Sequence, residues 1–237
     1  MLVCSRRYLL PLIITLCLSG GCGHPVQETA AHKIADALPQ LLGPAARYDV
    51  QVDGDPFALS RGRAQAVHIQ GLDVQMTPTV TLDTLRLDAT DVSFDKATRQ
   101  IAHIGGTAFM ATMSQEHLTE YLAHTKLLPG LVVTLRADDL EAQVPVTFLG
   151  LHTTAKLSGN LRPDTQEPNK LDFTANGAQV GILPLPAMLI NLAAGEINPL
   201  LDLSGLKAPV TVDSTTVSNG VLTLRGQARL ESLADVR

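Results

Sequence analysis

The sequence places a cysteine, Cys22, where a secreted bacterial protein could carry a covalently attached lipid. A short basic start precedes an almost wholly apolar stretch, residues 8–18, which leads into three small residues: Ser19, Gly20 and Gly21. This order is typical of a secretion signal, and a thiol directly after the cleavage site can accept a diacylglycerol. We therefore predict that residues 1–21 form a lipoprotein signal peptide and that Cys22 is the lipid attachment site.

Two alternatives to acylation stay open. Lipoprotein signals usually place Leu three residues before the cysteine, whereas Leu18 is four before Cys22. A plain secretory signal cut nearby, or an uncleaved anchor, is therefore also compatible with the sequence. A full membrane span fits least, because the apolar run is much shorter than the ~20 residues a spanning helix needs. The expected location is the cell membrane or the outer membrane, lipid-anchored, facing the periplasm or the exterior.

The seven histidines form no pattern typical of metal binding or acid–base catalysis. His117 and His124 share a predicted helix, but seven residues separate them, too many to share one metal ion without further ligands. His68, His103 and His152 fall in separate predicted strands without His, Cys or carboxylate at ligand spacing. We interpret all five as structural or solvated residues, and we predict no metal and no cofactor.

The sequence also lacks signatures of hydrolases and nucleotide-binding enzymes. It has no G-x-S-x-G elbow and no phosphate-binding glycine loop, and its only cysteine after the signal is Cys22. A paired-carboxylate enzyme stays open as an alternative, because its partners can come from distant strands. Such clefts usually offer aromatic or basic substrate contacts, however, and this chain has few of either. We predict that the protein is not an enzyme.

Charge and composition exclude some partners. The net charge of −5 becomes −7 once Arg6 and Arg7 leave with the signal. An acidic domain without basic clusters is a poor candidate for binding nucleic acid or anionic lipid heads. Aromatic residues make up only 3% of the chain and Trp is absent, which argues against base stacking. We expect no nucleic-acid partner.

The elements that position these residues follow from the hydrophobic periodicity. Residues 22–27 read as a tether and residues 28–42 as a first helix. From Arg47 the period changes to two, which predicts antiparallel strands with one polar and one apolar face. The alternation slips near Ala66–Val67 and near Asp83–Thr84, and we interpret each slip as a β-bulge.

The second half of the chain repeats this combination of helix and strands. Ser114 is expected to cap a helix over residues 115–125, and further strands are expected within residues 131–157 and 171–175. The sequence Ser218-Asn219-Gly220 predicts the turn of a closing hairpin. No linker divides the chain, so we treat residues 28–232 as a single α+β domain, in which long curved antiparallel strands pack against a few helices.

One segment carries no charged side chain, from the residue after Asp172 to the residue before Glu196. It contains an apolar stripe at helical spacing, formed by Leu185, Met188, Leu189 and Leu192. A helix that is apolar nearly all round must be covered by protein or must touch lipid. Two interpretations follow: a buried core helix, or a helix that lines a lipid-sized cavity or dips into a bilayer.

Several stretches together carry a family resemblance. They are VHIQGLDVQM (67–76), TLDTLRLDATDVSFD (81–95), SQEHLTEYL (114–122), ILPLPAMLINLAAGEINPLLDLSGL (182–206) and VTVDSTTVSNGVLTLRG (210–226). In this order, the run from Tyr48 to Leu230 resembles the LmeA-like family of bacterial envelope phospholipid-binding proteins. The Ile197-Asn198-Pro199-Leu200 turn is its most specific piece.

The resemblance implies a tubular lipid-binding-like fold, in which a curved sheet wraps around a helix and encloses an apolar tube for acyl chains. It implies no catalytic residue. We expect a membrane-tethered lipoprotein that binds phospholipid or a glycolipid, for lipid transport or envelope maintenance. The alternative is a non-enzymatic envelope adaptor with a solid core and a protein partner. The candidate cavity-lining residues are Phe109, Leu118, Leu122, Val133, Leu135, Val146, Phe148, Met188, Leu189 and Leu192.

Overall fold

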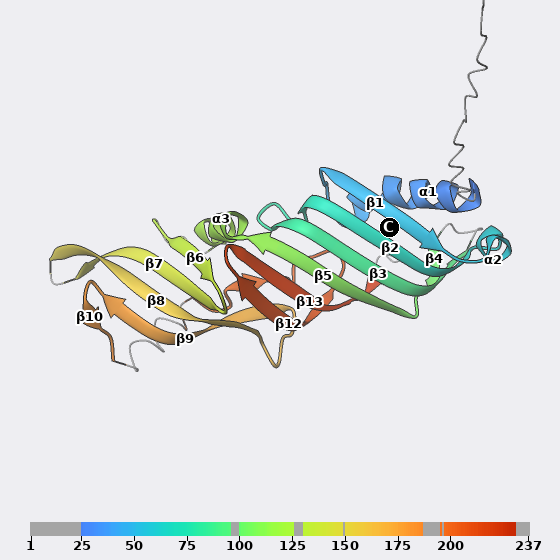
Figure 1. Ribbon diagram of the computed structural model, residues 1–237. Helices are drawn as coiled ribbons and strands as arrows, with labels where there is room; N and C mark the ends of the chain where they lie inside the picture. The colour runs from blue at the N-terminus through green and yellow to red at the C-terminus, as the bar shows by residue number, and fades with distance from the viewer. Residues whose placement is uncertain are drawn as a thin grey trace, which may run out of the picture.

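The computed structural model describes residues 25–95, 100–125, 130–148, 150–186, 195 and 197–230. These residues form an elongated molecule in which two antiparallel sheets lie end to end (Figure 1). The predicted signal peptide, Cys22 and the first part of the predicted tether lie outside the described residues. Most of the predicted apolar helix, residues 187–194, lies outside them as well.

The first sheet, called sheet A here, combines the beginning and the end of the chain. Its strands follow the order β1-β2-β3-β5-β13-β12, with β4 paired to β3. Their bounds are β1 (Arg47–Asp53), β2 (Arg63–Gln75), β3 (Thr81–Asp95), β4 (Gln100–His103), β5 (Gly106–Ser114), β12 (Val210–Ser218) and β13 (Val221–Ala228). The C-terminal hairpin thus completes a sheet begun by the N-terminal strands, because β13 pairs with β5.

The second sheet, called sheet B here, comes from the middle of the chain. Its order is β10-β9-β8-β7-β6, with β11 paired to β9. The bounds are β6 (Val132–Arg136), β7 (Asp139–Phe148), β8 (Leu151–Pro163), β9 (Lys170–Val180), β10 (Leu183–Pro184) and β11 (Leu201–Asp202). The expected α+β class with dominant antiparallel strands is confirmed, and the strands divide into two sheets instead of forming one.

The helices with described bounds are α1 (Pro25–Leu41), α2 (Pro56–Ser60) and α3 (Gln115–Thr125). Helix α1 begins at Pro25, three residues before the predicted start, and buries Leu38. Helix α3 has the predicted bounds, and the Ser114 hydroxyl accepts a hydrogen bond from the His117 amide at 3.4 Å. The Ser114 amide donates to the Asp83 carboxylate, so a side chain from β3 fixes the start of α3 as well.

Helix α3 and the closing hairpin join the two sheets. The Gln115 side-chain carbonyl accepts a hydrogen bond from the Leu135 backbone amide of β6 at 3.0 Å, while the backbone amide of Gln115 donates to the carbonyl of Gly220 at 2.8 Å. Gly220 has a φ of +80°, as the predicted Asn-Gly turn requires. The Tyr121 hydroxyl accepts from the Asp202 amide at 3.0 Å, and burial raises the pKa of Tyr121.

The predicted slips in β2 and β3 are present, but they are not one-strand bulges. Backbone pairs run from Ala64–Val92 to Ala66–Thr90 and, further along, from Leu72–Thr84 to Val74–Leu82. At each point both strands contain one residue outside these pairs, so the register does not shift. Asp91 and Asp73 occupy two of these positions with a φ of +50°. Because each interruption adds one residue to both strands, Gly71 and Val74 face the same side of the sheet although they are three positions apart. A Cβ added to Gly71 would lie 2.5 Å from the Val74 side chain.

The turn that the sequence marked as most specific has a defined structural role. The Asn198 side chain accepts a hydrogen bond from the Phe173 amide at 2.7 Å and donates to the Phe173 carbonyl at 3.0 Å. It therefore pairs with β9 as a neighbouring backbone would. Beside it, Leu200 and Leu201 are buried against Leu171 and extend the pairing into β11.

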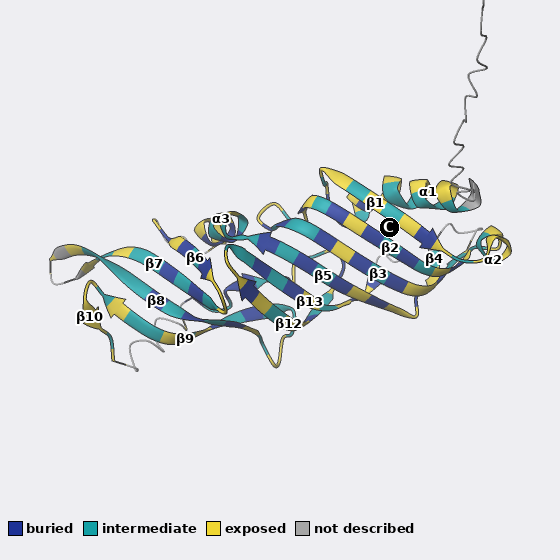
Figure 2. Ribbon diagram, in the orientation of Figure 1, coloured by how far each residue is buried: buried dark blue, intermediate teal, exposed yellow. Residues whose placement is uncertain are grey.

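Burial is unequal along the molecule (Figure 2). Strands β2, β3 and β5 of sheet A carry buried residues along their whole length, whereas β8 and β9 lose their buried positions toward the β10 end. Within the described ranges, no helix is long and apolar enough to cross a membrane.

Candidate lipid-binding site

A small apolar cavity lies between sheet A and the segment that precedes β12. Its walls come from β3, β5, β13, the β2–β3 turn, the end of α1 and residues 203–210, which we call the cover. The lining residues are Leu42, Met76, Val80, Leu82, Leu85, Leu87, Phe109, Ala111, Leu203, Leu206, Ala208, Val210, Leu224, Ala228 and Leu230. Every one of them is apolar. The cavity therefore suits a hydrocarbon group and offers nothing to a polar ligand.

The volume of the cavity is about 20 Å³. This is room for about one water molecule, and an apolar cavity of this kind stays dry. An acyl chain does not fit without movement of a wall. The described arrangement is therefore a closed one.

The cover is a largely irregular wall held by a few hydrogen bonds. The Leu203 amide donates to the Asn169 carbonyl at 3.0 Å, and the Pro209 carbonyl accepts from the Arg229 amide at 2.8 Å. The Lys207 ammonium group donates to the Gln40 carbonyl at the end of α1, at 2.7 Å. The opposite wall is formed by paired strands of sheet A. Widening the cavity at the cover thus disrupts fewer hydrogen bonds than separating the strands.

The structure brings one of the predicted candidates, Phe109, into the cavity wall. Four others are buried elsewhere: Leu118 and Leu122 on α3, and Val133 and Leu135 on β6. They pack together where the two sheets meet and do not line this cavity. Whether lipid contacts these four residues stays a prediction.

The remaining candidates belong to sheet B and the segment after it. Val146 lies on β7 with a partly exposed side chain, and Phe148 ends that strand. The side chain of Phe148 lies outside the described part of the structure, and so do Met188, Leu189 and Leu192. Their contact with lipid also stays a prediction.

Sequence reasoning missed most of the residues that form the cavity. Leu85, Leu87 and Leu224 occupy inward positions of clearly alternating strands, so the alternation signalled that they are buried. What it did not signal is the strand order. Only the pairing of β13 with β5, and of β5 with β3, places Leu224 beside Leu85 and Leu87.

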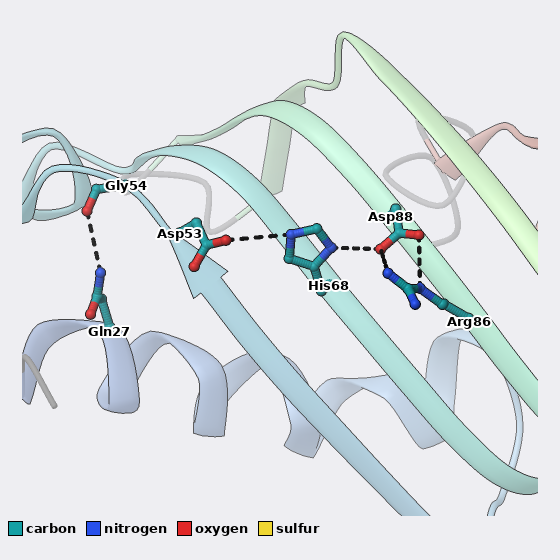
Figure 3. Close-up of polar contacts among 6 residues, drawn as sticks. All are labelled: Gln27, Asp53, Gly54, His68, Arg86 and Asp88. Carbon is teal, nitrogen blue, oxygen red and sulfur yellow. Dashed lines mark hydrogen bonds and ion pairs between the residues drawn. The ribbon is translucent and has the colours of Figure 1, made fainter. Parts of the chain in front are cut away.

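The solvent-facing side of sheet A carries a polar cluster that sequence spacing also failed to reveal. Figure 3 shows His68 between two carboxylates, with its Nδ1 2.5 Å from Asp88 and its Nε2 3.4 Å from Asp53. His68 lies directly opposite Asp88 in the β2–β3 register. Burial raises the pKa of Asp88, but hydrogen bonds from His68 and Arg86 outweigh this and hold it below its usual value.

This cluster is a cross-strand ionic network on the outside of the sheet, away from the cavity lining. Both His68 and Asp88 are partly exposed. Among the described residues, no three His, Cys, Asp or Glu side chains are grouped so that they could hold a metal ion. On the same side, the Gln27 amide donates to the Gly54 carbonyl at 3.3 Å and fastens the start of α1 to the end of β1 (Figure 3).

Comparison with known proteins identifies a family that matches this chain. The family model described as LmeA-like phospholipid-binding matches residues 26–227, which include nearly all of both sheets and most of the cavity lining. No curated protein and no solved structure matches the chain. The family is one of lipid-binding proteins and not of enzymes. On the strength of this match over most of its length, the chain belongs to the LmeA-like phospholipid-binding family.

Proposed function

We propose that this protein is a membrane-tethered lipoprotein that takes an acyl chain of a phospholipid, or of a related glycolipid, into the cavity of sheet A. Its role is lipid transport or maintenance of the cell envelope. The wholly apolar lining of the cavity is the observation that carries the proposal, and membership of a phospholipid-binding family supports it. Acylation at Cys22 provides the tether.

The energetics favour an enclosed acyl chain over one that is exposed to water during transfer. Each methylene kept out of water contributes about 0.8 kcal/mol, so ten methylenes contribute about 8 kcal/mol. Displacing the cover disrupts the hydrogen bonds of Leu203, Lys207 and Pro209, each worth about 1 kcal/mol net. Shielding a single acyl chain from water therefore exceeds the cost of those bonds more than twofold.

The small volume of the cavity favours a second candidate function. A cavity of only about 20 Å³ is also compatible with a solid-core envelope adaptor. Such a protein would bind a protein partner through its surface and would carry no lipid.

Native mass spectrometry followed by lipid extraction separates the two functions. The protein used is the chain from His24 onward, expressed without its signal and without Cys22. We expect one diacyl lipid per protein. A mass without ligand that persists after incubation with phospholipid vesicles would exclude the carrier function and favour the adaptor.

Filling the cavity tests its location. Ala208 is buried in the cover and lines the cavity, so Ala208→Phe should remove the space for an acyl chain and lower bound lipid at least tenfold, corresponding to about 1.4 kcal/mol. Ala142→Phe is the matched control, because Ala142 is equally buried but lies on β7 of sheet B. Overpacking costs both variants about 1–3 kcal/mol of stability. Equal lipid content in the two variants would place the lipid elsewhere.

The tether is tested by labelling intact cells with a palmitate analogue. The native chain should incorporate the label and Cys22→Ser should not, because the serine hydroxyl cannot replace the thiol. Equal labelling of both chains would contradict acylation at Cys22.

A further inference from the structure

Two large apolar side chains project into solvent at one tip of the molecule. Ile182 is 93% exposed and Leu183 is 58% exposed. Ile182 lies in the turn between β9 and β10 and Leu183 begins β10, at the end of sheet B farthest from α1 (Figure 1). We call residues 181–184 the tip.

The tip is held in place by hydrogen bonds on both sides. The Gly181 amide donates to the Thr154 carbonyl at 3.0 Å, and the Leu185 amide donates to the Ala178 carbonyl at 2.9 Å. Gly181 has a φ of +60°, a conformation that glycine adopts without strain. The exposure of Ile182 and Leu183 is thus set by the turn itself.

The surroundings of the tip are uncharged. Residues 173–195 contain no Asp, Glu, Lys or Arg, and neither do residues 143–155, in a chain that is 17% charged. Register brings these two runs together, because Ala155 pairs with Val180. The first charged side chain along β8 is Lys156, opposite Gln179. Two hairpins that are separate in sequence therefore form one neutral end.

We propose that the tip inserts into the surface of a phospholipid bilayer, with Ile182 and Leu183 entering the boundary between headgroups and acyl chains. Apolar side chains enter the boundary between headgroups and acyl chains favourably, and at this end of the molecule no neighbouring Asp, Glu, Lys or Arg has to leave water with them, a step that would be costly. Neutrality of both hairpins favours the bilayer. The contact goes beyond the proposed function, because it requires neither acylation of Cys22 nor lipid in the cavity.

A tryptophan reporter tests this insertion without background, since the chain contains no Trp. Ile182→Trp is compared with Phe57→Trp, whose native side chain is 64% exposed in α2 at the opposite end. Both are made in the full chain carrying Cys22→Ser, so that no attached lipid brings the protein to the vesicle. The vesicles are phosphatidylcholine with brominated acyl chains, which quench tryptophan on contact.

We expect the emission of Ile182→Trp to shift to the blue and to be quenched when vesicles are added, at low and high salt alike. Phe57→Trp should remain unchanged. Equal behaviour of the two reporters would overturn the proposal. So would a fluorophore at position 182 that is already shielded before vesicles are added, because another part of the chain or a second copy would then cover the tip.

A disruptive variant separates the tip from the cavity. In the chain from His24 onward, which lacks the apolar signal, Ile182→Asp should lower the vesicle-bound fraction about tenfold or more, because a charge replaces the apolar side chain that enters the bilayer. Lipid bound per protein, measured by native mass spectrometry, should stay unchanged. Unaltered vesicle binding would contradict insertion, whereas absence of lipid from both proteins would contradict only the carrier function.

Discussion

Sheet A and sheet B are both antiparallel, yet they treat their apolar faces differently. In sheet A, β13 buries Leu222, Leu224 and Ala228 along its whole length, and the cover closes over the cavity beside it. In sheet B, β9 buries Leu171 and Phe173 at one end, but no residue beyond Phe173 in that strand is fully buried. One sheet encloses its apolar surface, while the other leaves part of it accessible.

The difference comes from what packs on each face and not from the strands alone. The cover and the end of α1 pack against sheet A. The first half of β9 pairs with β11 and with the Asn198 side chain, whereas its second half leads to the tip. The contrast is consistent with the two proposals above, in which the cavity of sheet A takes an acyl chain and the tip of sheet B contacts a bilayer. The following predictions test that contrast.

The largest expected effect concerns core packing. Leu222→Ala removes a fully buried side chain from sheet A and should lower the free energy of unfolding by about 2–5 kcal/mol. Val180→Ala, at the partly exposed end of β9, should cost less than about 1 kcal/mol. Urea unfolding of both variants measures the two values. Similar losses would mean that the two regions are equally well packed.

A smaller effect is expected where sheet B is anchored. Asn198→Ala leaves the Phe173 amide and carbonyl without their partner, which should cost about 1–3 kcal/mol. Asn160→Ala on β8 is the control, with an expected loss below about 0.5 kcal/mol. Urea unfolding gives the stability, and hydrogen exchange at the Phe173 amide shows whether the loss is local. Unchanged exchange there would show that Asn198 does not hold β9.

The smallest effect concerns the outer face of sheet A. Because the pKa of Asp88 is held below its usual value, its charge stabilises the fold above the unfolded pKa of about 3.9. This contribution is lost as the pH falls through the lowered pKa of the folded state. Asp88→Asn should cost less than about 1 kcal/mol at pH 7, since the pair is partly exposed.

Urea midpoints between pH 7 and pH 2 provide the measurement. The gap between native protein and Asp88→Asn should close as the pH falls from ~5 toward 2, where both side chains are neutral. A gap that persists at pH 2 would show that the ionic contacts with His68 and Arg86 are not its cause.

Local features of the fold could be predicted from the sequence. The bounds of α3, its Ser114 cap and the hairpin turn at Gly220 depend on residues close in the chain, and all three are confirmed. The family resemblance and the antiparallel α+β class are likewise confirmed. Each of these rests on periodicity, capping chemistry or residue order.

Long-range features could not be predicted. Nothing near Leu224 in the sequence indicates that β13 pairs with β5, so the set of residues that lines the cavity could not be predicted. His68 and Asp88 meet only because of the β2–β3 register. Alternation identifies which residues point inward, but it does not say which strands are neighbours, and a binding site formed across several strands depends on that order.

The paired interruptions of β2 and β3 limit how the length of these strands can change. Removing one residue near Asp73 from β2 alone would shift the pairing of β2 with β3 by one residue beyond that point and would leave the extra residue of β3 without a counterpart. A compensating loss from β3 near Asp83 restores the register. Across related chains, insertions and deletions at these two levels should therefore occur together, as a covarying pair of gaps in an alignment.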